Sequence, residues 1–384
     1  MNIPDTPITR RTAVKAGSAV VAGLLLAGTG FANPANAAAV RAQRPWQATL
    51  TPTQQAGQRV IFSYPGLTPP ESLLSLIRAG QVGGVIFFGE NIHSLGQIAE
   101  VVQQLKEAHD SGPVTSPLLL MTDQEGGVVR RLRGQEPILS EKDIGLSADP
   151  LAEASKAGAG AGAALNAVGM NLNLAPVLDV FREPGNFDDE FGRSYSSDPQ
   201  VCGALGAAFV SAQQATGVAA TAKHFPGLGA ATRNQNTDLT EVTLNQPLSE
   251  LRAVDESAFA PSIATGVDLV MTSWAIYPAI DPVYPAGLSR AIVQGELRDR
   301  LRFDGVTITD ALEAGALDPF GDAGRRGVLA AQAGMDLLLC SGRDVDQGQA
   351  TVTAVAQAYE DHTLNPGHFT IALRRVMNLR DNLA

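Results

Sequence analysis

Residues 118–127 read Leu-Leu-Leu-Met-Thr-Asp-Gln-Glu-Gly-Gly, an apolar run that ends abruptly in charged and small residues. The run is continuous and does not alternate, which is typical of a strand covered on both faces in a parallel sheet. Seven further runs rich in Val, Ile, Leu and Phe end in the same way, at polar residues, Gly or Pro. Together with Leu118–Thr122, the predicted strands are Val60–Tyr64, Val82–Phe88, Asn171–Val177, Val218–Lys223, Asp268–Ser273, Gly305–Thr309 and Asp336–Cys340.

The stretches between these runs have the periodicity of helices. Ser94–His109 carries apolar residues three and four positions apart, the stripe of a half-buried helix, and Glu71–Arg78 is similar. Ala154–Ala167 is rich in Ala and Gly, which predicts a helix packed close to its neighbour. Asp198 and Asn245 each stand shortly before a proline and offer a capping side chain near a predicted helix start.

Eight strands, each followed by a helical stretch, predict an α/β fold of the TIM type, a (β/α)8 barrel. A doubly wound open sheet is the alternative architecture, but a Gly-x-Gly-x-x-Gly turn would normally follow its first strand. Here Tyr64-Pro65-Gly66 stands at that place, and no Pro/Ser-rich linker divides the chain after residue 50. We therefore expect a single barrel domain over residues 55–384.

The composition excludes several classes of protein. The chain has 384 residues, of which 45% are hydrophobic and 17% charged, and this apolar fraction is too high for a disordered chain. The formal net charge is −11, so the chain does not have the excess of positive side chains that is typical of a protein that binds nucleic acid or an anionic membrane. Cys202 and Cys340 are far apart, and the five histidines are scattered. The sequence thus predicts neither a disulfide framework nor a metal site.

The first 37 residues have the pattern of a cleaved export signal. Arg10 and Arg11 precede an apolar run over Ala16–Gly30 that is short for a membrane span, and the run is followed by the small-residue cleavage pattern Ala35-Asn36-Ala37. The segment resembles a twin-arginine export signal. We expect cleavage near Ala37, no stable membrane insertion afterwards, and an N-terminal extension over residues 38–54 of a secreted or cell-envelope protein.

Charged side chains gather where the predicted strands end. Asp123 follows the third strand, Lys223 and His224 end the fifth, Asp310 ends the seventh, and the loop after the fourth contains Arg193. In a (β/α)8 barrel the loops at the carboxyl ends of the strands converge over the barrel axis, where catalytic residues lie. We therefore expect these side chains to share one site.

Six stretches of the sequence resemble glycoside hydrolase family 3, and the resemblance extends over about residues 55–384. It is nearest to the single-domain β-N-acetylhexosaminidase branch, because the chain stops after the barrel. The stretches that carry the resemblance are Gly84–Phe88, Thr122–Gly127, Asn173–Val180, Gly192–Tyr195, Lys223–Gly227 and Phe303–Asp310.

This resemblance implies a hydrolase that cleaves β-linked sugars, above all terminal N-acetylglucosamine, with retention of configuration. Asp310 matches the nucleophilic carboxylate, and its apolar surroundings in the sequence suit a buried reactive group. The predicted export suggests a cell-wall or scavenged glycan as the partner, and no metal or organic cofactor is implied. The positions that match sugar-binding residues of the family are Asp123, Arg131, Arg193, Lys223 and His224.

The sequence departs from the family's pattern at the acid/base group. In the hexosaminidase branch, an Asp-x-His pair in the loop after the Lys-His-Phe-Pro-Gly motif supplies the general acid/base. Asn234 and Asn236 stand at these two places, and Leu228 replaces an earlier histidine. An amide has no proton equilibrium near neutral pH, so Asn236 cannot take the role.

Several carboxyl groups could replace the missing histidine. Asp238 is the choice that we carry forward, with Glu241 in the same loop as an alternative, and either would need a pKa raised by burial. Asp189 or Glu190, in the loop after the fourth strand, could instead reach the glycosidic oxygen.

Three other functions stay open at this point. The chain could be a carbohydrate-binding protein that has lost hydrolysis, or it could have the specificity of a β-glucosidase. A Schiff-base aldolase could use Lys223 at the end of the fifth strand, but that lysine would need a lowered pKa.

Overall fold

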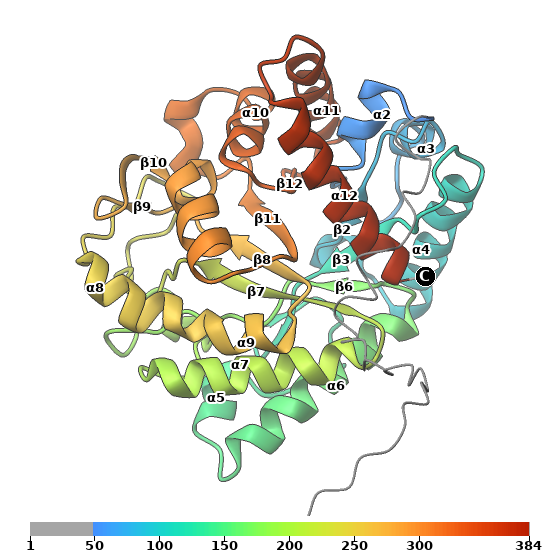
Figure 1. Cartoon of the computed structure of the whole chain (residues 1–384). Helices are drawn as coiled ribbons and strands as arrows, with labels where there is room; N and C mark the ends of the chain where they lie inside the picture. The colour runs from blue at the N-terminus through green and yellow to red at the C-terminus, as the bar shows by residue number, and fades with distance from the viewer. Residues whose placement is uncertain (1–48, 384) are drawn as a thin grey trace, which may run out of the picture. The chain divides into compact units, whose positions relative to one another are not determined.

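The computed structural model describes residues 49–383, and the barrel predicted from the sequence is confirmed (Figure 1). Eight parallel strands close into a barrel in the order β1–β12–β11–β8–β7–β6–β3–β2. The expected export signal and the extension up to residue 48 lie outside the described residues. The barrel strands are β1 (Val60–Phe62), β2 (Gly84–Ile86), β3 (Leu119–Thr122), β6 (Leu172–Asn173), β7 (Ala219–Phe225), β8 (Leu269–Thr272), β11 (Val306–Ala311) and β12 (Leu337–Leu339).

Each predicted run overlaps one barrel strand, although the boundaries differ at the carboxyl ends of several strands. β6 is shorter than the predicted Asn171–Val177 because regular pairing with β7 ends at Asn173, and only an isolated bridge between Val177 and Lys223 follows. β7 and β11 are longer than predicted and extend to Phe225 and Ala311. Lys223, His224 and Asp310 therefore lie within strands, at the points where the register with a neighbouring strand shifts: between Ala222 and Phe225 in β7, and between Ile308 and Ala311 in β11.

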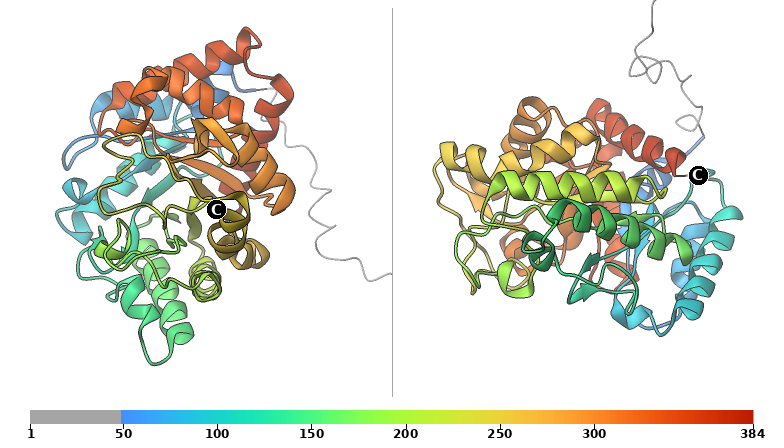
Figure 2. Two further views of the ribbon diagram at one scale, coloured as in Figure 1. Left: turned by 90° about the vertical axis from the view of Figure 1, so that its left-hand side faces the viewer. Right: turned by 90° about the horizontal axis from the view of Figure 1, so that it is seen from below.

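The helices lie outside the strands, as expected for this fold (Figures 1 and 2). The predicted helix Glu71–Arg78 matches α3, and Ser94 caps α4 through its side chain. The helices are α2 (Pro52–Gly57), α3 (Glu71–Arg78), α4 (Leu95–Asp110), α5 (Glu141–Gly145), α6 (Pro150–Ala167), α7 (Pro199–Gln214), α8 (Leu248–Glu250), α9 (Phe259–Thr265), α10 (Ala323–Ala333), α11 (Val345–Glu360) and α12 (Pro366–Asn382), with a π-helix over Ala291–Arg300 between β8 and β11.

The two predicted capping residues behave differently. Asp198 caps α7, where its side chain accepts a hydrogen bond from the backbone N–H of Gln200. The expectation for Asn245 is wrong, because the cap of α8 is Pro247 and no side chain bonds there. Asn245 stands two residues too early to reach the first turn of α8.

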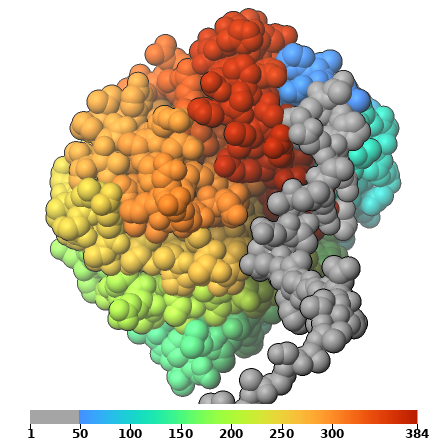
Figure 3. All heavy atoms as spheres, viewed as in Figure 1, coloured from blue at the N-terminus to red at the C-terminus, as the bar shows by residue number. Residues whose placement is uncertain are grey.

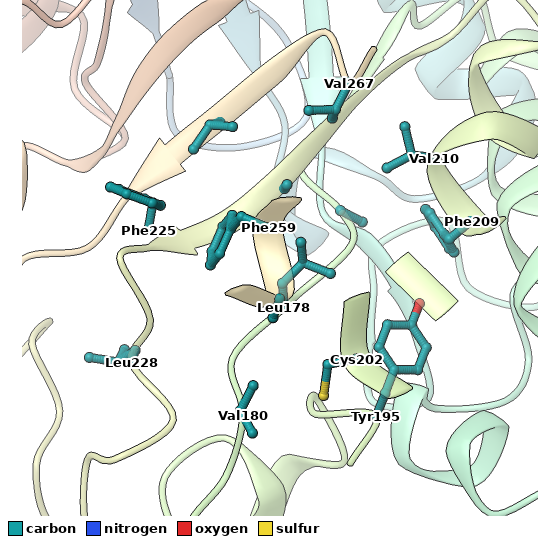
Figure 4. Close-up of a cluster of buried hydrophobic side chains, with 14 of the residues drawn as sticks. Leu178, Val180, Tyr195, Cys202, Phe209, Val210, Phe225, Leu228, Phe259 and Val267 are labelled. Atoms are coloured by element: carbon teal, nitrogen blue, oxygen red, sulfur yellow. The ribbon is translucent and has the colours of Figure 1, made fainter. Parts of the chain in front are cut away.

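The Ala/Gly-rich helix α6 packs closely against α7, as its composition predicts (Figure 2, right). A Cβ atom added at Gly158 would lie 2.1 Å from the carbonyl oxygen of Phe209 in α7. Behind these helices, side chains of α7 and α9 pack against the outer face of β7 (Figure 4). Phe225 of β7 and Phe259 of α9 meet edge to face there, with ring centroids 5.2 Å apart.

A second apolar cluster fills the barrel interior and continues into the last helix. It joins inward-facing residues of the strands, such as Ile61 and Leu269, to Val376 and Leu379 of α12. Figure 1 shows α12 crossing in front of the strands, and the red spheres of the C-terminal helices run from the top of this face toward its centre (Figure 3). Because apolar side chains fill the interior, the charged residues predicted to form the site lie at the carboxyl ends of the strands.

Two short hairpins stand among the loops of the barrel. β4 (Gln124–Gly126) pairs with β5 (Val129–Arg130) directly after β3, and β9 (Ile276–Tyr277) pairs with β10 (Asp281–Pro285) after β8. The first hairpin brings Arg131 back beside Asp123, since the N–H of Arg131 donates to the carbonyl of Asp123. Among residues 49–383, no helix has the length and apolar character to cross a membrane.

Candidate active site

A cavity of about 540 Å³ opens at the carboxyl ends of the barrel strands, and its wall carries side chains from seven of the eight strand ends. All seven residues that the sequence analysis assigns to the site line this one cavity. They are Asp123, Arg131, Arg193, Lys223, His224, Asp238 and Asp310.

The floor of the cavity is a buried network of opposite charges. The Nζ atom of Lys223 lies 2.9 Å from a carboxylate oxygen of Asp123 and 2.7 Å from one of Glu125. Arg193 binds both oxygens of Glu125, at 2.8 and 3.0 Å, and Arg131 lies 3.7 Å from Asp123. Burial alone would raise the pKa of Glu125, but Arg193 and Lys223 hold it well below its usual range. The network thus fixes donors and acceptors where sugar hydroxyls can bind them.

Glu125 is the residue of this network that the sequence analysis did not select. It belongs to the same Asp-Gln-Glu-Gly-Gly run as Asp123, so its place after β3 was the available signal. The structure gives it two ion pairs, because it joins Arg193 and Lys223 from neighbouring strand ends.

Replacing Glu125 with Gln should destabilise the fold, because it leaves the two buried cations with less negative charge. We expect a loss of about 2–4 kcal/mol in the free energy of unfolding, measured by urea denaturation at pH 7. The pKa of this carboxyl is lowered in the folded state, so its contribution is present above its unfolded pKa and is lost on acidification. The exposed Glu360 provides a matched control as Glu360→Gln. Equal stability of the two variants would contradict the assignment.

His224 is held by Asp179, a strand-end residue of the fourth unit. Asp179 Oδ2 lies 2.7 Å from Nδ1 of the imidazole, and Asp179 Oδ1 accepts hydrogen bonds from the backbone N–H groups of His224 and Leu228. Burial alone would lower the pKa of His224, but Asp179 raises it. Nδ1 is therefore occupied, and Nε2 is the ring nitrogen available to a ligand in the cavity.

The described residues contain one group with the donors of a metal site, namely Asp179, Asp188 and His224, whose ligand atoms lie within 4.8 Å of one another. Asp179 and His224 already use these atoms for each other, and Asp188 lies 3.4 Å from Arg193. Burial, with the charge of Asp179, raises the pKa of Asp188 to about 7. Arg193 thus supplies positive charge beside Asp188 Oδ1, whereas Asp188 Oδ2 has no hydrogen-bond partner among the described residues.

Asp310 stands near the end of β11, half-buried at the wall of the cavity. Its Oδ1 atom accepts a hydrogen bond of 2.8 Å from the N–H of Ala311. The carbonyl of Ala311 accepts another of 2.8 Å from the indole of the buried Trp274. The strand end that carries Asp310 is thus fixed by a large side chain from the neighbouring β8 loop.

Asp238 is brought to Asp310 by backbone hydrogen bonds between two loops. The carbonyls of Asp238 and Thr237 accept from the N–H groups of Gly315 and Ala316, at 2.8 and 3.0 Å. Gly315 permits this approach, since a Cβ atom there would lie 2.4 Å from the carbonyl of Leu239. Asp238 keeps contact with water through the open cavity, but the surrounding protein raises its pKa to about 6, and the negative charge of Asp310 contributes to this rise.

The other candidates for the acid/base role do not line the cavity. Glu241 is exposed in the same loop as Asp238 but does not line the cavity. Asp189 is buried, with Lys142 at 2.8 Å and the N–H of Gly185 at 2.6 Å, and Glu190 pairs with Arg233. Among the four candidates from the sequence, the structure places only Asp238 at the cavity wall.

Lys223 does not have the surroundings of a Schiff-base lysine. Burial alone would lower its pKa, but Asp123 and Glu125 raise it. Because a Schiff base forms from the neutral amine, two carboxylates within 2.9 Å favour the unreactive ammonium form. The aldolase alternative therefore does not fit this site.

Further lining residues had no clear signal in the sequence. Glu313 accepts hydrogen bonds from Ser341 and Gln347, so its carboxylate bridges the β11 and β12 loops. Phe187 and Phe191 lie in the loop after β6, where their neighbours in the sequence are acidic and polar.

Residues 55–379 match the family model described as "Glycosyl hydrolase family 3 N terminal domain". The protein belongs to glycoside hydrolase family 3. This family 3 chain is 48% identical over 332 residues to a protein of Arthroderma benhamiae named "Uncharacterized secreted glycosyl hydrolase", covering 86% of this chain and 93% of that one.

Two solved structures of family 3 relatives are similar in both fold and sequence. One is a glycoside hydrolase family 3 β-N-acetylglucosaminidase from Paenibacillus sp. str. FPU-7, with a TM-score of 0.82 and 33% identity over 87% of this chain. The present chain spans 63% of that protein's length. The other is a β-N-acetylhexosaminidase from Beutenbergia cavernae DSM 12333, with a TM-score of 0.77 and 35% identity, covering 86% of this chain and 98% of that one.

Proposed function

We propose that this glycoside hydrolase removes terminal β-linked N-acetylglucosamine with retention of configuration, using Asp310 as nucleophile and Asp238 as general acid/base. The observation that carries the proposal is the pairing of two carboxyl groups in one cavity, where the pKa of Asp238 is raised to about 6. Glycosidases of this kind need one carboxyl group that is protonated and one that is charged.

The charged network at the cavity floor would bind the terminal sugar. Asp123 accepts hydrogen bonds from hydroxyl groups, while Arg131, Lys223 and Nε2 of His224 supply donors or acceptors around the same ring. These contacts hold the anomeric carbon in front of Asp310, and their positions are fixed before substrate enters.

The reaction then proceeds in two displacements. Asp310 attacks the anomeric carbon, the glycosidic C–O bond breaks, and the leaving oxygen takes the proton of Asp238. Water then attacks the anomeric carbon of the glycosyl-enzyme from the opposite side, its proton passes to the Asp238 carboxylate, and Asp310 is released. Two inversions give a product with the configuration of the substrate.

The choice of N-acetylglucosamine is supported by the two structural relatives, which carry the names β-N-acetylglucosaminidase and β-N-acetylhexosaminidase. It is tested with 4-nitrophenyl β-N-acetylglucosaminide and β-glucoside in parallel, using NMR to identify the anomer that forms first. We expect faster turnover of the N-acetylglucosaminide and a β-anomer as first product. A faster reaction with the glucoside would assign β-glucosidase specificity, and an α-anomer would exclude the retaining mechanism.

A second candidate is a carbohydrate-binding protein without hydrolytic activity. It is favoured by Asn236, an amide that lines the cavity where the family resemblance places a histidine. Binding of N-acetylglucosamine by titration calorimetry, together with no turnover of either glycoside, would support this candidate.

We also infer that the chain is exported through a twin-arginine-type signal over residues 1–37 and acts on cell-wall or scavenged glycans. The Arthroderma relative is named as secreted, which agrees with an extracytoplasmic role. N-terminal sequencing of the protein recovered from culture medium should give a start near Ala38. An intact Met1 on a cell-bound protein would contradict the signal.

A further inference from the structure

Two aromatic rings on the loop after β6 line the cavity, and no sugar-binding or catalytic role is assigned to them above. Phe191 is 46% exposed, and Phe187 is half-buried against the apolar cluster behind the loop. Their ring centroids lie 6.3 Å apart in an edge-to-face arrangement. Phe187 thus anchors Phe191 from below, while much of the Phe191 ring stays open to solvent. An aromatic ring that is exposed inside a cavity can contact a bound ligand.

The loop that carries these rings is held firmly. Asp189 accepts a hydrogen bond from the N–H of Gly185 at 2.6 Å and pairs with Lys142. The chain then turns at Gly192, whose φ of 69° is the left-handed conformation that glycine adopts readily. Phe191 is therefore presented on a fixed turn, and little conformational entropy is lost when a ligand contacts it.

The same loop is joined to the loop that carries Asp238. The carbonyl of Gly229 accepts hydrogen bonds from Asn186 Nδ2 at 2.7 Å and from the N–H of Arg182 at 3.1 Å, and Glu190 pairs with Arg233. Phe187 and Phe191 thus lie on a loop that is bonded to the loop of Asp238, and all three residues line the same cavity. In a retaining glycosidase, the general acid lies beside the glycosidic oxygen, so the leaving group occupies that side.

The ring of Phe191 lies nearer to the solvent than the buried charged residues that would bind the terminal sugar. Glu125, Lys223 and His224 are at most 5% exposed, whereas Phe191 is 46% exposed at the outer wall. A sugar whose hydroxyls bind the buried charges would leave the ring of Phe191 beyond it, toward the mouth of the cavity.

We propose that Phe191, supported by Phe187, forms the subsite for the leaving group and takes the apolar face of a second ring, such as a β-linked sugar. This inference rests on the proposed hydrolase function and adds the preference for a substrate that extends past the bond to be cleaved. The C–H groups on one face of a pyranose match the flat ring, and no ion pair is needed. Phe191 therefore determines specificity and takes no part in proton transfer.

The test compares two substrates that differ by the second ring, N,N′-diacetylchitobiose and methyl β-N-acetylglucosaminide. Both have alkoxide leaving groups, so both depend on the general acid. For Phe191→Ala, we expect kcat/KM for the disaccharide to fall about five- to tenfold more than for the methyl glycoside. Phe191→Tyr, which keeps the ring, should restore most of the preference. Leu146→Ala changes a side chain that is 76% exposed and outside the cavity lining, and it should alter neither value.

Failure of the subsite and failure of the hydrolase function give different results. If wild type cleaves both substrates and Phe191→Ala lowers both equally, the subsite is wrong while the hydrolase function stands. If wild type cleaves neither substrate, titration calorimetry with the same two compounds tests the subsite through their dissociation constants. A dissociation constant for the disaccharide that rises about five- to tenfold more than that of the methyl glycoside in Phe191→Ala supports the subsite, and equal changes overturn it.

Discussion

Replacing Asp310 with Asn is expected to lower kcat/KM for 4-nitrophenyl β-N-acetylglucosaminide by about 10⁴-fold or more, because the amide cannot form the glycosyl-enzyme. The substitution is close to isosteric, and the Asn Oδ1 atom can still accept the hydrogen bond that the N–H of Ala311 donates to Asp310. The fold should therefore persist, and so should binding of the sugar by the charged network at the cavity floor. The measurement is steady-state kinetics together with sugar binding by calorimetry.

The matched control for this variant is Asp304→Asn. Asp304 is exposed just before β11, at the end of the strand that lies away from the cavity. We expect it to keep wild-type kinetics. Substantial activity in Asp310→Asn would remove Asp310 from the nucleophile role, and mass spectrometry of protein trapped with a slow 2-fluoro glycoside would then identify the residue that carries the sugar.

The second large effect is expected for Asp238→Asn. General acid catalysis contributes about 10²–10⁴-fold, so kcat/KM for methyl β-N-acetylglucosaminide should fall by that amount. Nitrophenolate leaves without a proton, and 4-nitrophenyl β-N-acetylglucosaminide should therefore be affected less in the first displacement. Glu241→Gln makes the same acid-to-amide change at an exposed position three residues later in the sequence, and it serves as the control. Equal losses on the two substrates would contradict an acid role for Asp238.

The pH dependence gives a separate test of Asp238. As an acid it must be protonated, and although Asp238 is exposed to the cavity, the loss of part of its hydration and the charge of Asp310 raise its pKa in the free protein to about 6. Wild-type kcat/KM for the methyl glycoside should therefore be high below about pH 6 and fall as the pH rises through this value. Asp238→Asn should lack this basic limb. If kcat/KM of the variant still falls over the same pH range, the decrease is caused by the titration of another group.

The barrel could be predicted because each strand is buried on both faces. An apolar run such as Leu118–Thr122 contains enough information to recognise a strand without knowing its neighbours. The ends of the strands were less predictable. β6 stops at Asn173, where regular pairing with β7 ends, and β11 continues through Asp310 because β12 pairs with it as far as Ala311.

The site could be predicted as a set, but its internal connections could not. Asp123 and Lys223 are a hundred positions apart, and their shared ion pair follows from the order of the strands in the closed sheet. Asp238 was one of four possible acids in the sequence. Its selection depends on backbone hydrogen bonds to Gly315 and Ala316, and such contacts leave no trace in local composition. Phe191 gave no signal because a lone aromatic residue in a polar loop has no periodicity.

The pairing of β1 with β12 also has a consequence for biosynthesis. Val60 lies opposite Leu338 in this pair, so the first and last barrel strands meet only when nearly the whole chain is available. A nascent chain on the ribosome cannot close the barrel before β12 has left the ribosome. Contacts between residues so far apart in the sequence also make folding slow. A polypeptide interrupted within α10 would leave β1 and β11 with unpaired edges, which favour aggregation over partial function. Premature termination before β12 should therefore be as damaging to this protein as loss of a catalytic group.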